Sequence, residues 1–134
     1  MKRMLFLLLS CLFATVLLAQ GRGKPQVEVL YFHGKQRCVS CRAMEKFARE
    51  VVEQDFAREH RQGKVVFRVV DITTKAGAQL AKSYRVTWSS LYVTGWKRGK
   101  ATRCNLTQFG FRYARKDPKA FKQGLVKKIK EQLK

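Results

Sequence analysis

The chain has 134 residues and a formal net charge of +20, which allows about one domain of ordinary size with a strongly basic surface. The excess of positive charge is greatest in residues 95–134, which hold 13 basic residues and only two acidic ones, Asp117 and Glu131. Such a region is either a solvated basic helix or a surface that attracts acidic proteins, anionic lipid or nucleic acid. We expect an acidic protein partner and no nucleic acid, because no recognition motif accompanies the charge.

The first residues predict a signal peptide. The letters MKR form a charged start, an apolar run begins at Met4, and the small residue Ala19 stands at a cleavage site. We therefore expect residues 1–19 to be removed and the protein to be exported, either to the periplasm or envelope of a bacterium or out of the cell. Two alternatives to cleavage stay open, and we expect the protein to be attached to a membrane only if one of them holds. One is an uncleaved anchor, although the 16 residues from Met4 to Ala19 are short for a bilayer span; the other is lipid attachment at Cys11.

Residues 20–25 predict a flexible lead-in to a single domain at residues 26–134. Residues 26–33 (QVEVLYFH) predict a central strand, because apolar residues first alternate with others and then run together. Residues 39–60 predict one amphipathic helix of about six turns. Its apolar positions are Met44, Phe47, Ala48, Val51, Val52 and Phe56.

The middle of the chain predicts a second strand and a shorter helix. Residues 64–72 (KVVFRVVDI) are apolar at successive positions, as in a strand covered by helices on both faces. Residues 74–83 predict a helix that is capped by Thr73 or Thr74. Its expected inward residues are Ala76, Leu80 and Ala81.

The next stretch predicts a hairpin. Residues 90–94 and 100–105 predict two strands joined by a turn at residues 97–99. Two strands joined through a helix must run parallel, and a following hairpin can extend the same sheet in the antiparallel sense.

Two helical segments complete the chain. One would begin near Asn105 or Thr107 and run to Lys116, and Pro118 would restart or kink it. The core-facing stripe of the last helix would be Phe121, Leu125, Ile129 and Leu133. The resulting order, β-α-β-α-β-β-α, predicts an α/β fold with a central mixed sheet flanked by helices.

Two cysteines, Cys38 and Cys41, stand three positions apart where the helix of residues 39–60 begins. Free amide hydrogens and the helix dipole favour a thiolate at this place, and Arg37 and Arg42 add positive charge. The thiolate is the form that attacks a disulfide. We therefore expect Cys38 to be the nucleophile, and Cys41, one turn later and more buried, to be the resolving thiol.

The order of elements and the C-x-x-C pair at a helix start together resemble the thioredoxin-like superfamily over nearly all of residues 26–134. The stretches VLYFHGKQRCVSC, VVFRVVDI and VTWSSLYV further resemble a family of small exported bacterial thioredoxin-like proteins, the ArsF family, labelled nitrophenyl compound nitroreductase subunit. The resemblance implies a thioredoxin-like fold and a thiol–disulfide oxidoreductase or electron relay that acts on a partner protein. No flavin or nicotinamide site is visible, so no cofactor is expected.

Several positions depart from the thioredoxin pattern. Ser90 stands where the resemblance implies a cis-proline. A cis peptide bond before a residue other than proline costs about 2.5–4 kcal/mol, so we expect a trans bond or a rearranged loop here. The resemblance also implies a buried aspartate, but its position falls near Phe32, where no acidic residue stands. Arg37 stands where the resemblance implies a tryptophan before the first cysteine. Proton transfer to the thiols must then come from water, from His33 or from another group. His33, Arg37 and Arg42 are the residues expected to tune the pKa of the thiols. The residues expected to shape the docking surface are Trp88, Ser89 and Ser90.

Other interpretations of the same residues stay open. His33, Cys38, Cys41 and Cys104 could ligate a metal, but structural zinc usually draws on two closely spaced pairs and only one is present, so no metal is expected. A purely structural disulfide would close a very small loop and stabilise little. Cys104 is expected to be a small buried hydrophobe. The main non-enzymatic alternative is an interaction module, or a subunit of an envelope reductase, that binds without turnover.

Overall fold

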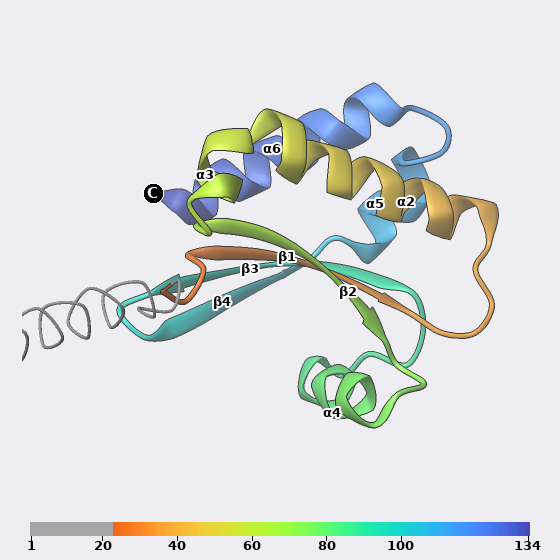
Figure 1. The fold of residues 1–134 in the computed structure, drawn as a ribbon. Helices are drawn as coiled ribbons and strands as arrows, with labels where there is room; N and C mark the ends of the chain where they lie inside the picture. Colours follow the sequence, from red (N-terminus) through yellow and green to blue (C-terminus); the bar gives the residue numbers. More distant parts are fainter. Residues whose placement is uncertain (1–22) are drawn as a thin grey trace, which may run out of the picture.

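A computed structural model describes residues 23–134, so the predicted signal peptide, residues 1–19, lies outside the described residues. The 4-stranded sheet has the order β2-β1-β3-β4 (Figure 1). β1 runs parallel to β2 and antiparallel to β3, and β3 runs antiparallel to β4. The strands are β1 (Val27–His33), β2 (Val65–Asp71), β3 (Ser90–Lys97) and β4 (Lys100–Asn105).

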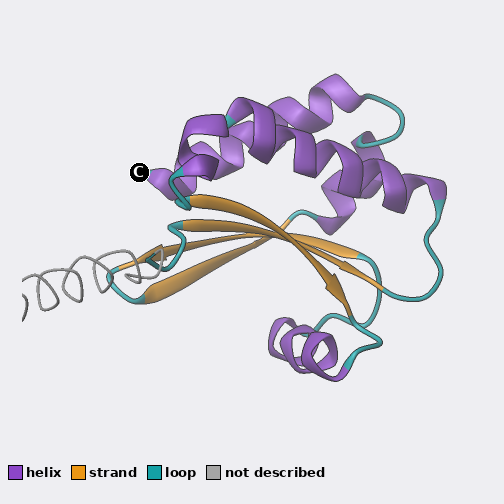
Figure 2. Ribbon diagram, in the orientation of Figure 1, coloured by secondary structure: helices purple, strands orange, loops and turns teal. Residues whose placement is uncertain are grey.

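Helices cover both faces of this sheet (Figure 2). α2, α5 and α6 lie on one face together with the short segments η1 and α3, while α4 lies alone on the other face. Within residues 23–134, no helix is both long enough and apolar enough to cross a bilayer. The helical segments are α2 (Val39–Glu50), η1 (Val51–Asp55), α3 (Ala57–Arg61), α4 (Lys75–Tyr84), α5 (Thr107–Tyr113) and α6 (Pro118–Leu133).

This architecture confirms the predicted fold class. β1 and β2 are parallel and joined through α2, and β3 joins the same sheet on the other side of β1 in the antiparallel sense. The strand order, the strand directions and the helices on both faces are those of a thioredoxin-like α/β fold.

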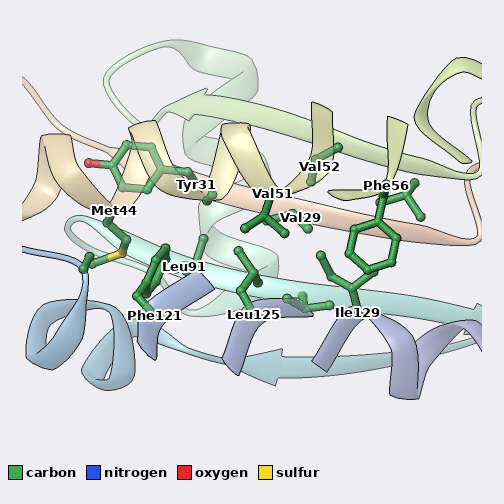
Figure 3. Close-up of a cluster of buried hydrophobic side chains, with 14 of the residues drawn as sticks. Val29, Tyr31, Met44, Val51, Val52, Phe56, Leu91, Phe121, Leu125 and Ile129 are labelled. Atoms are coloured by element: carbon green, nitrogen blue, oxygen red, sulfur yellow. The ribbon is translucent and has the colours of Figure 1, made fainter. Parts of the chain in front are cut away.

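β1 is an interior strand, as predicted, and all of its residues are buried. Because side chains alternate along a strand, Val27, Val29 and Tyr31 pack on the α2 face, whereas Leu30 and Phe32 pack on the α4 face. The cluster on the α2 face is the larger core and fills the space between the sheet, α2 and α6 (Figure 3). Its fully buried members on other elements include Met44, Val51, Val52, Leu91, Phe121, Leu125 and Ile129.

β2 differs from its prediction in one respect. α2 and α3 contact it from one side and α4 from the other, as expected, but β2 is an edge strand. Val66 and Phe67 are therefore only half-buried, and Arg68 is exposed. The apolar run correctly predicted helices on both faces, but it carries no information on whether a strand has one neighbour or two.

The predicted helix of residues 39–60 is divided into α2, η1 and α3. η1 is a turn of π-helix, after which the Phe56 amide donates to the Val51 carbonyl at 3.2 Å. The buried residues Ala48, Val52 and Phe56 recur every four positions, a spacing wider than the 3.6 residues of an α-helical turn. A π turn is wider than an α turn, so it keeps these side chains facing the sheet.

α4 confirms the predicted helix and its cap, because the Thr74 hydroxyl accepts a hydrogen bond from the Gly77 amide at 3.0 Å. The expectation that Ala76 faces inward is wrong: Ala76 is exposed and Gly77 is buried. A side chain at Gly77 would collide with the Asp71 carbonyl oxygen. The helix can therefore approach the end of β2 this closely only with glycine at that position.

The hairpin is confirmed, with a longer first strand than predicted. Arg98 and Gly99 both adopt left-handed φ angles, 51° and 76°, and such a two-residue turn matches the twist of the strands on either side. Pairing therefore continues to Lys97 and Lys100.

The last helices are separated as predicted, and the Asn105 side chain accepts a hydrogen bond from the Thr107 amide at 2.9 Å at the start of α5. α5 ends before Lys116, and Asp117 caps α6, whose first residue is Pro118. The Thr107 hydroxyl does not cap α5. It accepts a hydrogen bond from the Leu91 amide at 3.1 Å and so ties α5 to β3.

Candidate redox site

Cys38 and Cys41 form a disulfide at the start of α2, where the sequence places them. Cys38 is the N-cap residue, and its Sγ accepts a hydrogen bond from the Cys41 amide at 3.1 Å. The two residues differ in access to solvent, because Cys38 is exposed whereas Cys41 is only 5% exposed. Disulfide exchange uses such an arrangement, with one accessible sulfur to meet a partner and one sheltered sulfur to finish the reaction.

An open cleft lies over this disulfide. Its wall combines the loop of residues 34–37, the first turn of α2, residues 87–89 and Phe111 of α5. Trp88 is 61% exposed and stacks on Phe111, with ring centroids 5.2 Å apart and an interplanar angle of 9°. This pair gives the cleft an apolar wall beside the sulfurs. The sequence predicted Trp88 but missed Phe111, because no local pattern marks a contact between α5 and this loop.

The two serines predicted for docking have different positions. Ser89 lies in the wall of the cleft and is only 5% exposed. Ser90 begins β3, lies outside the cleft wall, and donates from its hydroxyl to the Trp88 carbonyl at 3.1 Å. Ser90 thus supports the Trp88 segment, and its docking role stays a prediction. All peptide bonds among residues 23–134 are trans, including the one before Ser90.

Arg37 is engaged by two partners at the edge of the cleft. Its Nη1 donates to the Glu45 carboxylate at 2.5 Å, and its Nη2 donates to His33 Nε2 at 2.6 Å. His33 Nδ1 lies 2.9 Å from the Gly34 carbonyl oxygen. A guanidinium only donates and a carbonyl only accepts, so both contacts together require a neutral ring with its proton on Nδ1. The structure thus brings Arg37 and His33 together, as expected, and adds Glu45, which the sequence analysis missed.

Lys35 and Arg42 are the cations that stay open to the cleft. Both side chains are exposed and line the cleft around the disulfide. Arg37, by contrast, shares its charge with the Glu45 carboxylate. Arg42, Lys35 and the free amides of the first turn of α2 are therefore the sources of positive potential near Cys38.

Tyr31 is a further residue of this region that the sequence analysis missed. The implied buried acid was counted back to Phe32, but Phe32 packs on the α4 face, whereas Tyr31 packs in the same cluster as Cys41. Tyr31 is 0% exposed, and its hydroxyl has no hydrogen-bond partner among residues 23–134. Burial raises the pKa of Tyr31; Ser89 is close enough to lower this pKa, yet it does not reach hydrogen-bond geometry.

Cys104 lies apart from the disulfide cleft. It is a free thiol on β4 that packs against the larger core but is only half-buried, less than predicted, and its Sγ accepts from the Gln132 side-chain amide at 3.4 Å. In the described part of the chain, no group of three or more His, Cys, Asp or Glu side chains is placed to hold a metal ion.

A larger concavity lies along α6. This groove has a volume of about 930 Å³, against about 710 Å³ for the cleft over the disulfide. The cleft holds the reactive sulfurs, so the groove is a charged surface and not the reaction site. The basic residues that line the groove are Lys119, Lys122, Lys127, Lys130 and Lys134.

No family model matches the chain, and no curated protein matches it. Among solved structures, the chain is similar to the solution structure of a thioredoxin from Thermus thermophilus, at 27% sequence identity over 84% of this chain and 82% of that chain, with a TM-score of 0.49. It is also similar to the structure of a malarial protein, at 17% identity over 75% of this chain and 98% of that chain, with a TM-score of 0.44. Both superpositions are loose, so the assignment of the fold follows from the strand order and directions described above.

Proposed function

We propose that the protein is an exported thiol–disulfide oxidoreductase, or an electron relay, that uses Cys38 and Cys41 on a partner protein. One observation carries the proposal: the pair forms a disulfide at the start of α2 in an open cleft, with Cys38 exposed and Cys41 only 5% exposed. A structural disulfide that spans so short a loop stabilises little, so its exposure to a cleft favours a redox role.

The reaction is written in the reducing direction. The Cys38 thiolate attacks one sulfur of the partner's disulfide, a mixed disulfide forms, and the other partner sulfur leaves as a thiolate that takes a proton from solvent. The Cys41 thiol then loses its proton and attacks Cys38 Sγ, which closes the Cys38–Cys41 disulfide and releases the second partner thiolate. Two electrons pass from the dithiol to the partner, and the reverse sequence oxidises a partner dithiol.

Activation of Cys38 is attributed to its place in the fold. The N-cap position directs free amide hydrogens and the positive end of the α2 dipole at the sulfur, and Arg42 adds a charge from the cleft wall. These interactions stabilise the thiolate and leave the neutral thiol unaffected, so they increase the reactive fraction at neutral pH.

The surface around the cleft would bind the partner. The stacked rings of Trp88 and Phe111 offer apolar area to the residues that flank a partner's disulfide, and Ser89 lies at the same wall. The lysine groove along α6 supports an acidic protein as partner, because opposite charge speeds the encounter of two proteins.

Export is part of the proposal and is supported by the sequence of residues 1–19. Protein disulfides persist in the periplasm and outside the cell, whereas cytosolic reductants remove them. An exported protein of this kind would need a partner that renews its dithiol or its disulfide, and the envelope reductase implied by the ArsF resemblance is one such partner.

The second candidate is an interaction module without turnover. The observation in its favour is the exposed Trp88, which stacks on Phe111 and could bind a partner without using the sulfurs. A nitroreductase-associated subunit would fall in this class if it contributed only binding.

Reduction of insulin disulfides in the presence of dithiothreitol tests the proposal. The full chain should accelerate the reaction well above dithiothreitol alone, Cys38→Ser should abolish the acceleration, and Cys104→Ser, outside the cleft, should retain it. A wild-type chain no faster than dithiothreitol alone would support the interaction module instead.

A further inference from the structure

The Tyr31 hydroxyl is the one buried side-chain polar atom in residues 23–134 that has no hydrogen-bond partner. Tyr31 is 0% exposed, so solvent does not satisfy the group. Leaving a buried donor unpaired is costly, and native proteins rarely do so without a reason. The orphan hydroxyl therefore points to an acceptor that is missing from this state of the protein.

The position of Tyr31 shows where such an acceptor would lie. Its side chain packs on the α2 face of the sheet in one cluster with Cys41 and Met44, and its hydroxyl is directed toward the start of α2 (Figure 3). Leu91 is the partner of Tyr31 in the β1–β3 register, and Ser89 precedes Leu91 by two positions. Ser89 and Cys41 line the same cleft. The hydroxyl is thus enclosed between the first turns of α2 and the segment that holds Ser89.

The charge around Tyr31 keeps the hydroxyl a donor. Burial raises its pKa, Ser89 lowers the pKa, and the opposing charges of Glu45 (which raises it) and Arg37 (which lowers it) lie nearby. Glu45 and Arg37 are paired with each other, and Arg37 also donates to His33 Nε2. A phenol whose pKa is raised keeps its proton at neutral pH and can donate it in a hydrogen bond to a nearby thiolate.

The covalent bond to Cys38 holds Cys41 Sγ outside hydrogen-bond geometry with the Tyr31 hydroxyl. A thiol released from that bond is a weak acceptor and a thiolate a strong one. Opening of the disulfide therefore creates the acceptor that the hydroxyl lacks, on the buried sulfur of the same cluster.

We propose that the Tyr31 hydroxyl donates a hydrogen bond to Cys41 Sγ when the disulfide is open, and that Tyr31 is thereby a catalytic residue of the resolving step. The inference rests on the proposed exchange function. In that step Cys41 gives its proton to water in the cleft, and its thiolate, held by the hydroxyl, attacks Cys38 Sγ. The Cys38–Cys41 bond forms as the bond between Cys38 and the partner breaks, and the partner thiolate leaves with both electrons of that bond. Tyr31 keeps its own proton throughout.

The test compares Tyr31→Phe with Tyr84→Phe. Both variants remove one hydroxyl from a buried tyrosine, but the Tyr84 hydroxyl is on the α4 face, bonded to Thr94. The first measurement is the equilibrium of the Cys38–Cys41 disulfide with glutathione, followed by thiol trapping and mass spectrometry. Tyr31→Phe should shift it toward the disulfide by about two- to tenfold, the size expected from one hydrogen bond to a neutral thiol. Tyr84→Phe should leave it at the wild-type value.

The second measurement isolates the buried sulfur. In a Cys38→Ser background, the thiolate fraction of Cys41 at neutral pH is read from ultraviolet thiolate absorbance, with Cys104 replaced by serine to remove its signal. Adding Tyr31→Phe should reduce that fraction by about tenfold. A change in packing alone would not move this readout.

Equal disulfide equilibria and equal thiolate fractions in wild type and Tyr31→Phe would overturn the inference. Tyr31→Phe is expected to fold, because it removes only an unpaired group, and circular dichroism checks this. Failure of the wild-type chain to reduce insulin would refute the exchange function instead. The two measurements above need no partner protein, so the two failures are distinguishable.

Discussion

The tyrosine hydroxyls on the two faces of the sheet differ in their hydrogen bonding. On the α4 face, the Tyr84 hydroxyl shares a hydrogen bond with Thr94 at 2.8 Å, and the Tyr92 hydroxyl donates to the Tyr84 carbonyl at 3.3 Å. On the α2 face, the Tyr31 hydroxyl has no partner within residues 23–134. The first face has the pairing expected of a part that only stabilises the fold. The second leaves a donor open in the cluster that contains a reactive sulfur, and a functional site can use such a group.

The largest expected difference in stability between the faces comes from removing a hydroxyl from each. Thr94→Val leaves the buried Tyr84 hydroxyl without its partner and should lower the free energy of unfolding by about 1–3 kcal/mol. Tyr31→Phe removes an unpaired group, so the free energy of unfolding should stay the same or rise. Urea unfolding with the disulfide intact measures both. An equal loss of stability in the two variants would show that the Tyr31 hydroxyl is bonded in the oxidised protein.

The next effect concerns two tryptophan rings, the exposed Trp88 at the cleft and the half-buried Trp96 near the end of β3. Trp88→Ala removes the ring that stacks on Phe111 at the cleft and should lower kcat/KM for a protein disulfide by about three- to tenfold, the range expected for one aromatic contact. The loss should appear in KM, because the sulfurs are unchanged. Trp96→Ala is the matched control, since Trp96 lies beside Pro25 and Glu28 and outside the cleft. A loss of similar size from Trp96→Ala would mean that Trp88 has no special role in docking.

A smaller, salt-dependent effect should separate α6 from α4. Lys119→Glu combined with Lys127→Glu inverts charge in the α6 groove and should slow exchange with an acidic protein substrate several-fold at low salt. Screening should shrink this difference as ionic strength rises. Lys82→Glu makes the same kind of change on the exposed surface of α4 and should change the rate less. Rates that do not depend on ionic strength in any of these chains would contradict recruitment by charge.

The smallest effect is the pH dependence of stability, to which Glu28 and Asp71 should contribute in opposite senses. Burial raises the pKa of Glu28 and Arg68 only partly opposes this, so the folded state binds more protons than the unfolded state just above the ordinary pKa of the side chain. Stability should therefore fall as pH rises through that interval, and Glu28→Gln should remove the fall. The hydroxyl and amide of Thr73 lower the pKa of Asp71, so its contribution is present above its ordinary pKa and lost as pH falls. Urea unfolding over an acid pH series would refute the assignment if Glu28→Gln and Asp71→Asn changed the profile in the same sense.

The elements that the sequence predicted are those set by local patterns. Alternation marked the interior strand β1, the spacing of Phe121, Leu125 and Ile129 marked the buried side of α6, and Thr74 marked the start of α4. The site at the start of α2 was predicted for the same reason, because Cys38 and Cys41 stand in a local context of loop and helix.

The features that escaped prediction depend on contacts between distant parts of the chain or on a count of one residue. Side chains alternate with a period of two along a strand, so a count from Cys38 that is wrong by one exchanges Phe32 for Tyr31 and moves the residue to the other face. Glu45 belongs to a charged stretch of helix typical of a solvated surface, and only the folded loop brings Arg37 to it. The π turn of η1 likewise reflects the fit of its residues against the sheet, which periodicity does not encode.

Trapping of the mixed disulfide tests the central claim most directly. In Cys41→Ser the resolving sulfur is absent, so the reduced protein, mixed with an excess of a disulfide-containing protein, should accumulate one covalent adduct, which peptide mass spectrometry locates at Cys38. The account predicts this adduct in Cys41→Ser and only a transient one in the wild type. An adduct formed at Cys104 instead, or no adduct at any cysteine, would contradict the assignment of Cys38 as the attacking sulfur.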